Sequence, residues 1–130
     1  MIVKIPVSIG ELIDKITILE IKNKKIKDKK KLINIKLELK LLNDFVKKKK
    51  LNSKLIKNLK IKLLKVNQNL WLVEDKLRDH EYKNKFNQTF ISLARKVYYL
   101  NDQRSVIKKN INESFGSKIV EEKSYKQYKR

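Results

Sequence analysis

The chain has 130 residues, the size of one domain, and carries a formal net charge of +20 at pH 7. Glycine occurs twice and proline once, which argues against a turn-rich β-sheet protein and favours long helices. Cysteine is absent, which excludes disulfide frameworks, thiolate nucleophiles and thiol-ligated zinc or iron–sulfur sites. We therefore expect one all-α domain over residues 1–130, with no metal and no cofactor.

The positive charge comes almost entirely from lysine, since 30 lysines stand against 4 arginines, beside 16 isoleucines, 12 asparagines and one alanine. AT-rich coding produces this bias, so part of the charge is expected to reflect codon usage. Glutamate also has AT-rich codons but is not enriched as lysine is, so codon usage does not explain the whole excess of positive charge. The N-terminus lacks the apolar run of a signal peptide, and no apolar stretch approaches the ~20 residues of a membrane span. A soluble cytoplasmic protein is expected.

The first helix is predicted to begin at the capping box Ser8-Ile9-Gly10-Glu11. Apolar residues then recur at helical spacing until the lysines of residues 24–27, and Asp28 predicts the N-cap of a second helix. Because no glycine or proline separates the two helices, one continuous rod is the alternative. The second helix has an apolar seam in alternating steps of three and four residues, Leu32, Ile35, Leu39, Leu42 and Val46.

A turn is predicted after the lysine run of residues 47–50, with Asn52 or Ser53 capping a third helix. The seam of that helix is Ile56, Leu59, Leu63, Val66, Leu70, Val73 and Leu77. Further apolar residues widen this stripe, namely Leu55, Ile61, Leu64, Trp71 and Leu72. We therefore expect the third helix to be covered on two sides, either at the centre of a bundle or in an interface with a second subunit. Trp71 is expected to serve this packing.

A fourth helix is predicted from the N-cap Asn87 to the C-terminal cap glycine Gly116, forming an antiparallel hairpin with the third. Its seam is Phe90, Leu93, Val97, Leu100, Ile107 and Ile111. Arg104 occupies a position in this seam where its neighbours are apolar. Because an uncompensated buried charge is costly, Arg104 should be buried and paired with a carboxylate. The candidate carboxylates are Glu74, Asp75 and Asp14.

The fold predicted from these elements is an antiparallel helical bundle, or coiled-coil hairpins, of about four helices. Short extended segments are expected at both ends. The β-prone residues 2–5 and 118–121 either pair as a ribbon or stay irregular.

Several segments follow a family pattern, above all IPVSIGELIDKITILEIK at residues 5–22 and VEEKSY at residues 120–125. The shorter matching segments are residues 70–71, 73–75, 93–95, 97–98 and 101–102. The chain resembles a family of small bacterial and phage proteins known only as a domain of unknown function. The resemblance is close at both ends of the chain, whereas the middle matches only in its length and residue pattern. It implies no activity, cofactor or catalytic residue. That family is nearer to charge balance and often has proline after the position of Asp28, where this chain has Lys29. These departures favour codon usage as a source of the lysines.

A lysine-rich region spans residues 22–65, which hold 18 lysines and 3 acids, a net charge of +15. Such a region could bind nucleic acid weakly, without sequence preference and with strong salt dependence. The candidate contacts are Lys47, Lys48, Lys49, Lys50, Lys54 and Lys57. Base readout or stacking is not expected, because Phe45 is the only aromatic residue in the region. A solvated lysine face is the favoured interpretation.

A second group of charged and polar residues lies on the first, third and fourth helices, where it could converge at one end of the bundle. Its members are Asp14, Lys15, Glu20, Glu74, Asp75, Arg78, Arg95, Asn101, Asp102 and Arg104. They could bind an anionic metabolite or form the site of a small enzyme. The favoured alternative is structural: Glu11–Lys15 and Glu74–Arg78 are ordinary i,i+4 pairs, and the rest fix the register of the helices.

No catalytic residue is assigned, and the single histidine excludes the paired Glu-x-x-His motifs of di-iron bundles. We expect a non-catalytic helical binding or assembly module that forms a homo-oligomer, with a further protein partner as an option. The alternatives are a nonspecific nucleic-acid-binding protein and a small helical enzyme or metabolite-binding protein.

Overall fold

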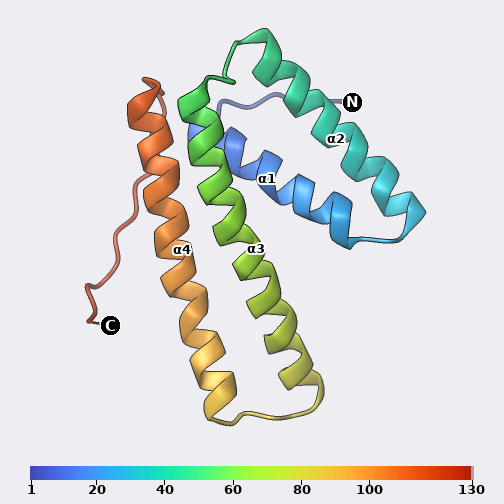
Figure 1. Cartoon of the computed structure of the whole chain (residues 1–130), viewed down its shortest axis with the longest axis vertical. Helices are drawn as coiled ribbons and strands as arrows, with labels where there is room; N and C mark the ends of the chain where they lie inside the picture. The colour runs from blue at the N-terminus through green and yellow to red at the C-terminus, as the bar shows by residue number, and fades with distance from the viewer. Residues whose placement is uncertain (130) are drawn as a thin grey trace.

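The computed structural model describes residues 1–129, and four helices make up most of them (Figure 1). These are α1 (Ile9–Lys25), α2 (Lys29–Lys48), α3 (Lys54–Tyr82) and α4 (Gln88–Ser114). Residues 1–129 contain no β-strand, so the predicted all-α helical bundle is confirmed. None of the four helices is long and apolar enough to cross a membrane.

Each helix begins at a side chain that accepts the backbone N–H three residues further on. These caps are Ser8, Asp28, Ser53 and Asn87. Asp28 therefore separates α1 from α2, and the continuous rod is not formed. Gly116 follows α4 with a φ of +63°, the left-handed conformation of a C-terminal cap glycine. All four starts agree with the predicted caps.

The arrangement is built on an antiparallel hairpin of α3 and α4 (Figure 1). Helix α1 crosses one end of this hairpin and contacts both of its helices. Among the helices of residues 1–129, α2 lies along α1 alone. The half of the hairpin nearest the α3–α4 turn therefore extends beyond α1 and α2 (Figure 1).

The best-buried apolar side chains lie where α1 crosses the hairpin. Ile13 of α1, Ile56 and Leu63 of α3 and Ile111 of α4 pack together, and each is at most 2% exposed. Val46, near the end of α2, packs against the same cluster. This core holds α1 rigidly against α3 and α4, the three helices that supply the polar residues described below.

Helix α3 is buried along one face, at Ile56, Leu63, Val66, Leu70 and Val73. Leu55, Ile61 and Leu72, which widened its predicted stripe, are exposed instead. Ile61 and Leu72 lie on the same side of the helix, but polar Lys65 and Gln68 come between them. Of the two predicted alternatives, a central position of α3 in the bundle is therefore wrong, since α1 and α4 cover a single broad face. Coverage of its other side by a second subunit stays a prediction.

Helix α2 carries the most continuous exposed apolar surface among the helices. Ile33, Leu37, Leu41 and Phe45 are spaced one turn apart and are 67%, 59%, 45% and 46% exposed. We call these four residues the α2 stripe. On the side facing α1, Ile35 is buried, so α2 has one apolar side packed and another open to solvent.

Residues 2–5 and 118–121 are irregular and do not pair as a ribbon. The C-terminal tail runs back beside α4 (Figure 1). Along this path Lys109 Nζ lies 3.1 Å from a carboxylate oxygen of Glu122, and the Tyr128 hydroxyl donates a hydrogen bond to Asp102. The tail is thus attached to α4 by polar contacts.

Candidate functional site

Polar residues line the contact between α1 and α4. On α4, Arg104, Lys108 and Asn112 follow one another at four-residue intervals, which places them on one side of the helix. On α1 they meet Gly10 and Asp14. Asn112 Oδ1 accepts a hydrogen bond from the Gly10 N–H at 2.6 Å, and Lys108 Nζ lies 3.9 Å from Asp14 Oδ2. Such a polar interface between two helices is specific, because each group requires its own partner.

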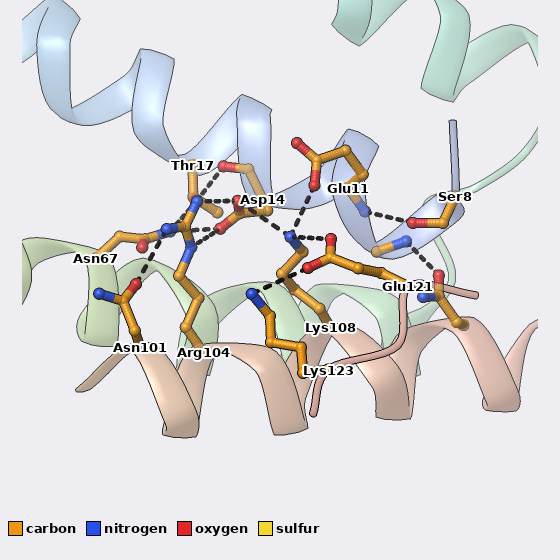
Figure 2. A network of polar contacts seen from close by, with 12 residues as sticks. Ser8, Glu11, Asp14, Thr17, Asn67, Asn101, Arg104, Lys108, Glu121 and Lys123 are labelled. Atoms are coloured by element: carbon orange, nitrogen blue, oxygen red, sulfur yellow. Dashed lines mark hydrogen bonds and ion pairs between the residues drawn. The ribbon is translucent and has the colours of Figure 1, made fainter. Parts of the chain in front are cut away.

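Asp14 is the centre of this interface and is 1% exposed. Arg104 donates to both of its carboxylate oxygens, from Nε at 2.9 Å and from Nη2 at 2.5 Å (Figure 2). Asn67 Nδ2 of α3 donates to Oδ1 at 2.9 Å, and also to Thr17 Oγ1 at 2.8 Å. The bidentate pair and the amide satisfy a buried charge that would otherwise be costly. We call Asp14, Thr17, Asn67, Arg104 and Lys108 the Asp14 network.

The prediction that Arg104 pairs with a carboxylate is confirmed, and of its three candidate partners Asp14 is the one bonded. The side chain is partly buried, with 27% of its surface exposed. Hydrogen bonding to Asp14 raises the pKa of the Arg104 guanidinium, so this side chain stays positively charged.

Lys108 joins the Asp14 network to the C-terminal tail. Its Nζ lies 2.7 Å from Glu11 Oε2 and 3.2 Å from Glu121 Oε2 (Figure 2). Lys123 lies 3.2 Å from the other oxygen of Glu121. Hydrogen bonds from Lys123, and next from Lys108, lower the pKa of Glu121. The tail is thus held to α4 by a charged group that itself contacts α1.

A groove opens beside the Asp14 network, between α1, α3 and α4, with a volume of about 440 Å³. We call it the α1–α3–α4 groove. Its lining consists of Ile18, Ile21, Asn67, Leu70, Trp71, Glu74, Asp75, Arg78, Asn101 and Arg104. Half of the charged and polar group predicted from the sequence therefore lines one concave surface. Asp14 does not itself line the groove, but it is bonded to Arg104, which does.

The other four members of that group have separate partners. Lys15 Nζ lies 3.8 Å from Glu38 of α2, and Glu20 pairs with Lys60 of α3 at 2.7 Å. Arg95 donates to the Tyr99 hydroxyl at 2.7 Å, and Asp102 accepts from Tyr128 in the tail. The structure therefore divides the predicted group between a groove and several surface contacts.

Neither predicted i,i+4 pair is formed. Glu11 turns to Lys108, and Lys15 turns to Glu38 across the α1–α2 contact. Glu74 and Arg78 make no ion pair or hydrogen bond with each other or with any other side chain in residues 1–129. Glu11 and Lys15 therefore pair with residues of neighbouring helices instead of with each other. Glu74 and Arg78 both line the groove described above.

The sequence did not single out Thr17, Asn67 and Lys108, which complete the Asp14 network. It also did not single out Asn112 and Glu121, which contact Gly10 and Lys108 beside it. A signal was present, because Asn101, Arg104, Lys108 and Asn112 recur in steps of three and four residues. That spacing predicts a polar side of α4 in the same way that apolar spacing predicts an apolar side. Asn67 has no such signal, because it lies beside seam position Val66, and only the structure shows that it is 5% exposed.

The lysines considered for nucleic-acid binding lie at the end of α2 and the start of α3. Lys47, Lys48, Lys49, Lys50, Lys54 and Lys57 are all exposed, and within the described residues none of them has an ion-pair partner. They form a positive surface. As for metals, no three side chains of His, Cys, Asp or Glu gather in a metal-binding arrangement within residues 1–129.

Residues 3–128 match the model of a family of unknown function, DUF6165, and the chain belongs to this family. Neither the curated proteins nor the solved structures include a match to the chain. Family membership assigns no ligand, partner or reaction, so a function has to rest on the geometry of this chain.

Proposed function

We propose that this protein is a non-catalytic assembly module that forms a homo-oligomer through the α2 stripe. The observation that carries the proposal is the continuity of this surface. Four large apolar side chains follow one another at four-residue intervals on the solvent side of a single helix. Burying one such side chain fully stabilises a complex by about 1.5–3 kcal/mol. A contiguous apolar surface of this kind marks an interaction site more often than isolated exposed leucines do.

A second copy of the chain is the occupant that we propose. An isologous two-fold contact needs only one self-complementary surface, and the α2 stripe is an inclined row of side chains of the kind that packs against a second helix. In an antiparallel arrangement centred between Leu37 and Leu41, these two leucines would lie opposite each other across the interface. Ile33 would then lie opposite Phe45 of the second copy. The large side chains would alternate along the contact as in other helix pairs.

The charge beside the stripe predicts how self-association depends on salt. Lys29, Lys36, Lys40 and Lys47 recur at intervals of seven, four and seven residues, which places them in one row along an edge of the stripe. In an antiparallel two-fold contact this row lies near its own copy, and the two rows repel each other, since within residues 1–129 only Lys40 of the four has an acidic partner, Asp44. Salt screens that repulsion, so association should strengthen as salt is added. Nucleic-acid binding by the same lysines would weaken.

The experiment is light scattering coupled to size-exclusion chromatography, at low salt and at about 0.5 M salt, where the Debye length is about 4 Å. We expect a mass of twice the 15.6 kDa monomer at high salt. Leu41→Glu should give a monomer, because it places a charge in the stripe. Leu72→Glu is the matched control, since Leu72 is 48% exposed against 45% for Leu41 and lies outside the stripe. It should remain dimeric. A wild-type monomer at every concentration would contradict the proposal.

A further inference from the structure

The α1–α3–α4 groove has the size and lining of a small-molecule site. Its volume of about 440 Å³ falls within the range of small-ligand pockets, about 300–1,000 Å³. Ile18, Leu70 and Trp71 give it an apolar surface, and the Asp14 network forms one rigid wall. An apolar surface with a few fixed polar groups is the usual composition of a ligand pocket.

The charges that remain free in the groove are predominantly negative. Arg104 also lines it, but its guanidinium is bound by both oxygens of Asp14, so the pair contributes no net charge. Glu74, Asp75 and Arg78 make no hydrogen bond or ion pair inside residues 1–129. Two free carboxylates against one free guanidinium leave a net negative charge, on a chain whose total is +20. The groove therefore favours a cationic group over the anionic metabolite considered from the sequence.

Asn67 provides a second, independent indication. The side chain is 5% exposed and lines the groove. Its amide nitrogen is used twice, in bonds to Asp14 and Thr17, which fixes the orientation of the amide (Figure 2). Its amide oxygen accepts no hydrogen bond from residues 1–129. Although the side chain as a whole is largely buried, this oxygen is not enclosed by protein atoms, so it is open to the groove and can accept a hydrogen bond from an N–H group of a ligand.

Trp71 indicates which kind of group the ligand carries in addition to its cation. It is partly exposed where it lines the groove, whereas packing alone was expected for it from the sequence. An indole ring attracts an ammonium group over its face and presents a broad apolar surface to a hydrocarbon.

We infer that the α1–α3–α4 groove binds a small organic ammonium compound, a primary amine attached to an apolar body. The ammonium group lies against the carboxylates of Glu74 and Asp75 and donates to the Asn67 oxygen. The apolar body packs on Trp71 and Ile18. This site is separate from the α2 stripe, and the inference does not depend on self-association.

The binding experiment uses the fluorescence of Trp71, which is the only tryptophan of the chain. Three non-fluorescent probes share one apolar body and differ in their polar group: 2-cyclohexylethylamine, 2-cyclohexylethanol and 3-cyclohexylpropionate. We expect the amine to change the Trp71 emission in a saturable way. The alcohol should bind at least about ten-fold more weakly, because a charge-assisted hydrogen bond is worth at least about one factor of ten. The carboxylate should bind most weakly.

Paired variants test the position of the cation. Glu74→Gln and Asp75→Asn should each weaken amine binding by about ten-fold while leaving the circular dichroism melt unchanged. Glu81→Gln is the matched control, since it removes the same charge from the exposed last turn of α3 and lies outside the groove. It should leave amine binding unchanged. The inference is overturned if none of the probes saturates up to about 10 mM, a concentration at which a ligand with a millimolar Kd is bound. It is also overturned if the carboxylate binds better than the amine, or if Glu74→Gln has no larger effect than Glu81→Gln.

Discussion

Asp14 shows how one residue organises the contact between three helices. Its carboxylate comes from α1, its amide partner Asn67 from α3, and its guanidinium partner Arg104 from α4. The carboxylate is almost wholly buried and shares its charge with a bidentate arginine. In such a site, the loss of one partner leaves the other charge without compensation.

Asp14→Asn should therefore lower the free energy of unfolding by about 3 kcal/mol, as expected when one partner of a buried ion pair is removed. Asp44→Asn is the matched control, because Asp44 pairs with Lys40 on the solvent side of α2 with 62% of its side chain exposed. It should cost about 0.5 kcal/mol or less. Urea denaturation of the two variants measures the difference. Equal effects would mean that the Arg104–Asp14 pair contributes no more than a surface pair.

The individual helices were predictable because their limits are encoded locally. Ser8, Asp28, Ser53 and Asn87 each bond a backbone amide three residues away, so a short window of sequence contains the whole interaction. The contacts between helices were less predictable, because many pairings satisfy the same apolar spacing. That α2 lies along α1 alone depends on the tertiary arrangement and not on the seam of α2.

The candidate site was predictable only in part, for the same reason. The anomaly of Arg104 in an apolar seam could be recognised from one helix, and its pairing followed from the cost of a buried charge. Asn67 and Lys108 gave no such anomaly on their own helices, since each lies beside a seam position. Their importance arises where α1 crosses the hairpin, which brings together residues 50 and more positions apart.

At the level of elements, Gly10 controls how closely α1 approaches α4. A Cβ atom at this position would lie 2.5 Å from the backbone oxygen of Lys108 and 3.0 Å from Asn112 Oδ1. The first of these atoms belongs to the backbone and cannot move aside alone. The absence of a side chain therefore permits the close contact in which Asn112 accepts the Gly10 N–H.

The change in stability caused by Gly10→Ala shows whether close packing or helix propensity dominates at this position. Alanine inside a helix normally stabilises by about 1 kcal/mol relative to glycine. Overpacking at the α1–α4 contact costs about 1–3 kcal/mol, and more where backbone must shift. We therefore expect a net loss of about 1–2 kcal/mol. Thermal or urea unfolding tests this, and a variant more stable than the wild type would contradict the close approach of the two helices.

For the whole molecule, the distribution of the charges matters more than their sum. Residues 22–65 carry +15 of the total +20 and include all of α2 and the start of α3. The Asp14 network and the groove lie outside this region, among residues that carry a net charge of only +5. The structure therefore separates a lysine-rich part, which also carries the α2 stripe, from a part with paired charges and a groove.

The most direct test of the proposed assembly is site-specific cross-linking, which is simple because the chain contains no cysteine. Leu41→Cys and Leu72→Cys each introduce one thiol at leucines of similar exposure. A short bismaleimide links two copies only where the same residue lies near its symmetry mate. We predict efficient formation of a covalent dimer at high salt for Leu41→Cys and little for Leu72→Cys. Absence of the dimer for Leu41→Cys, or equal yields for the two variants, would contradict association through the α2 stripe.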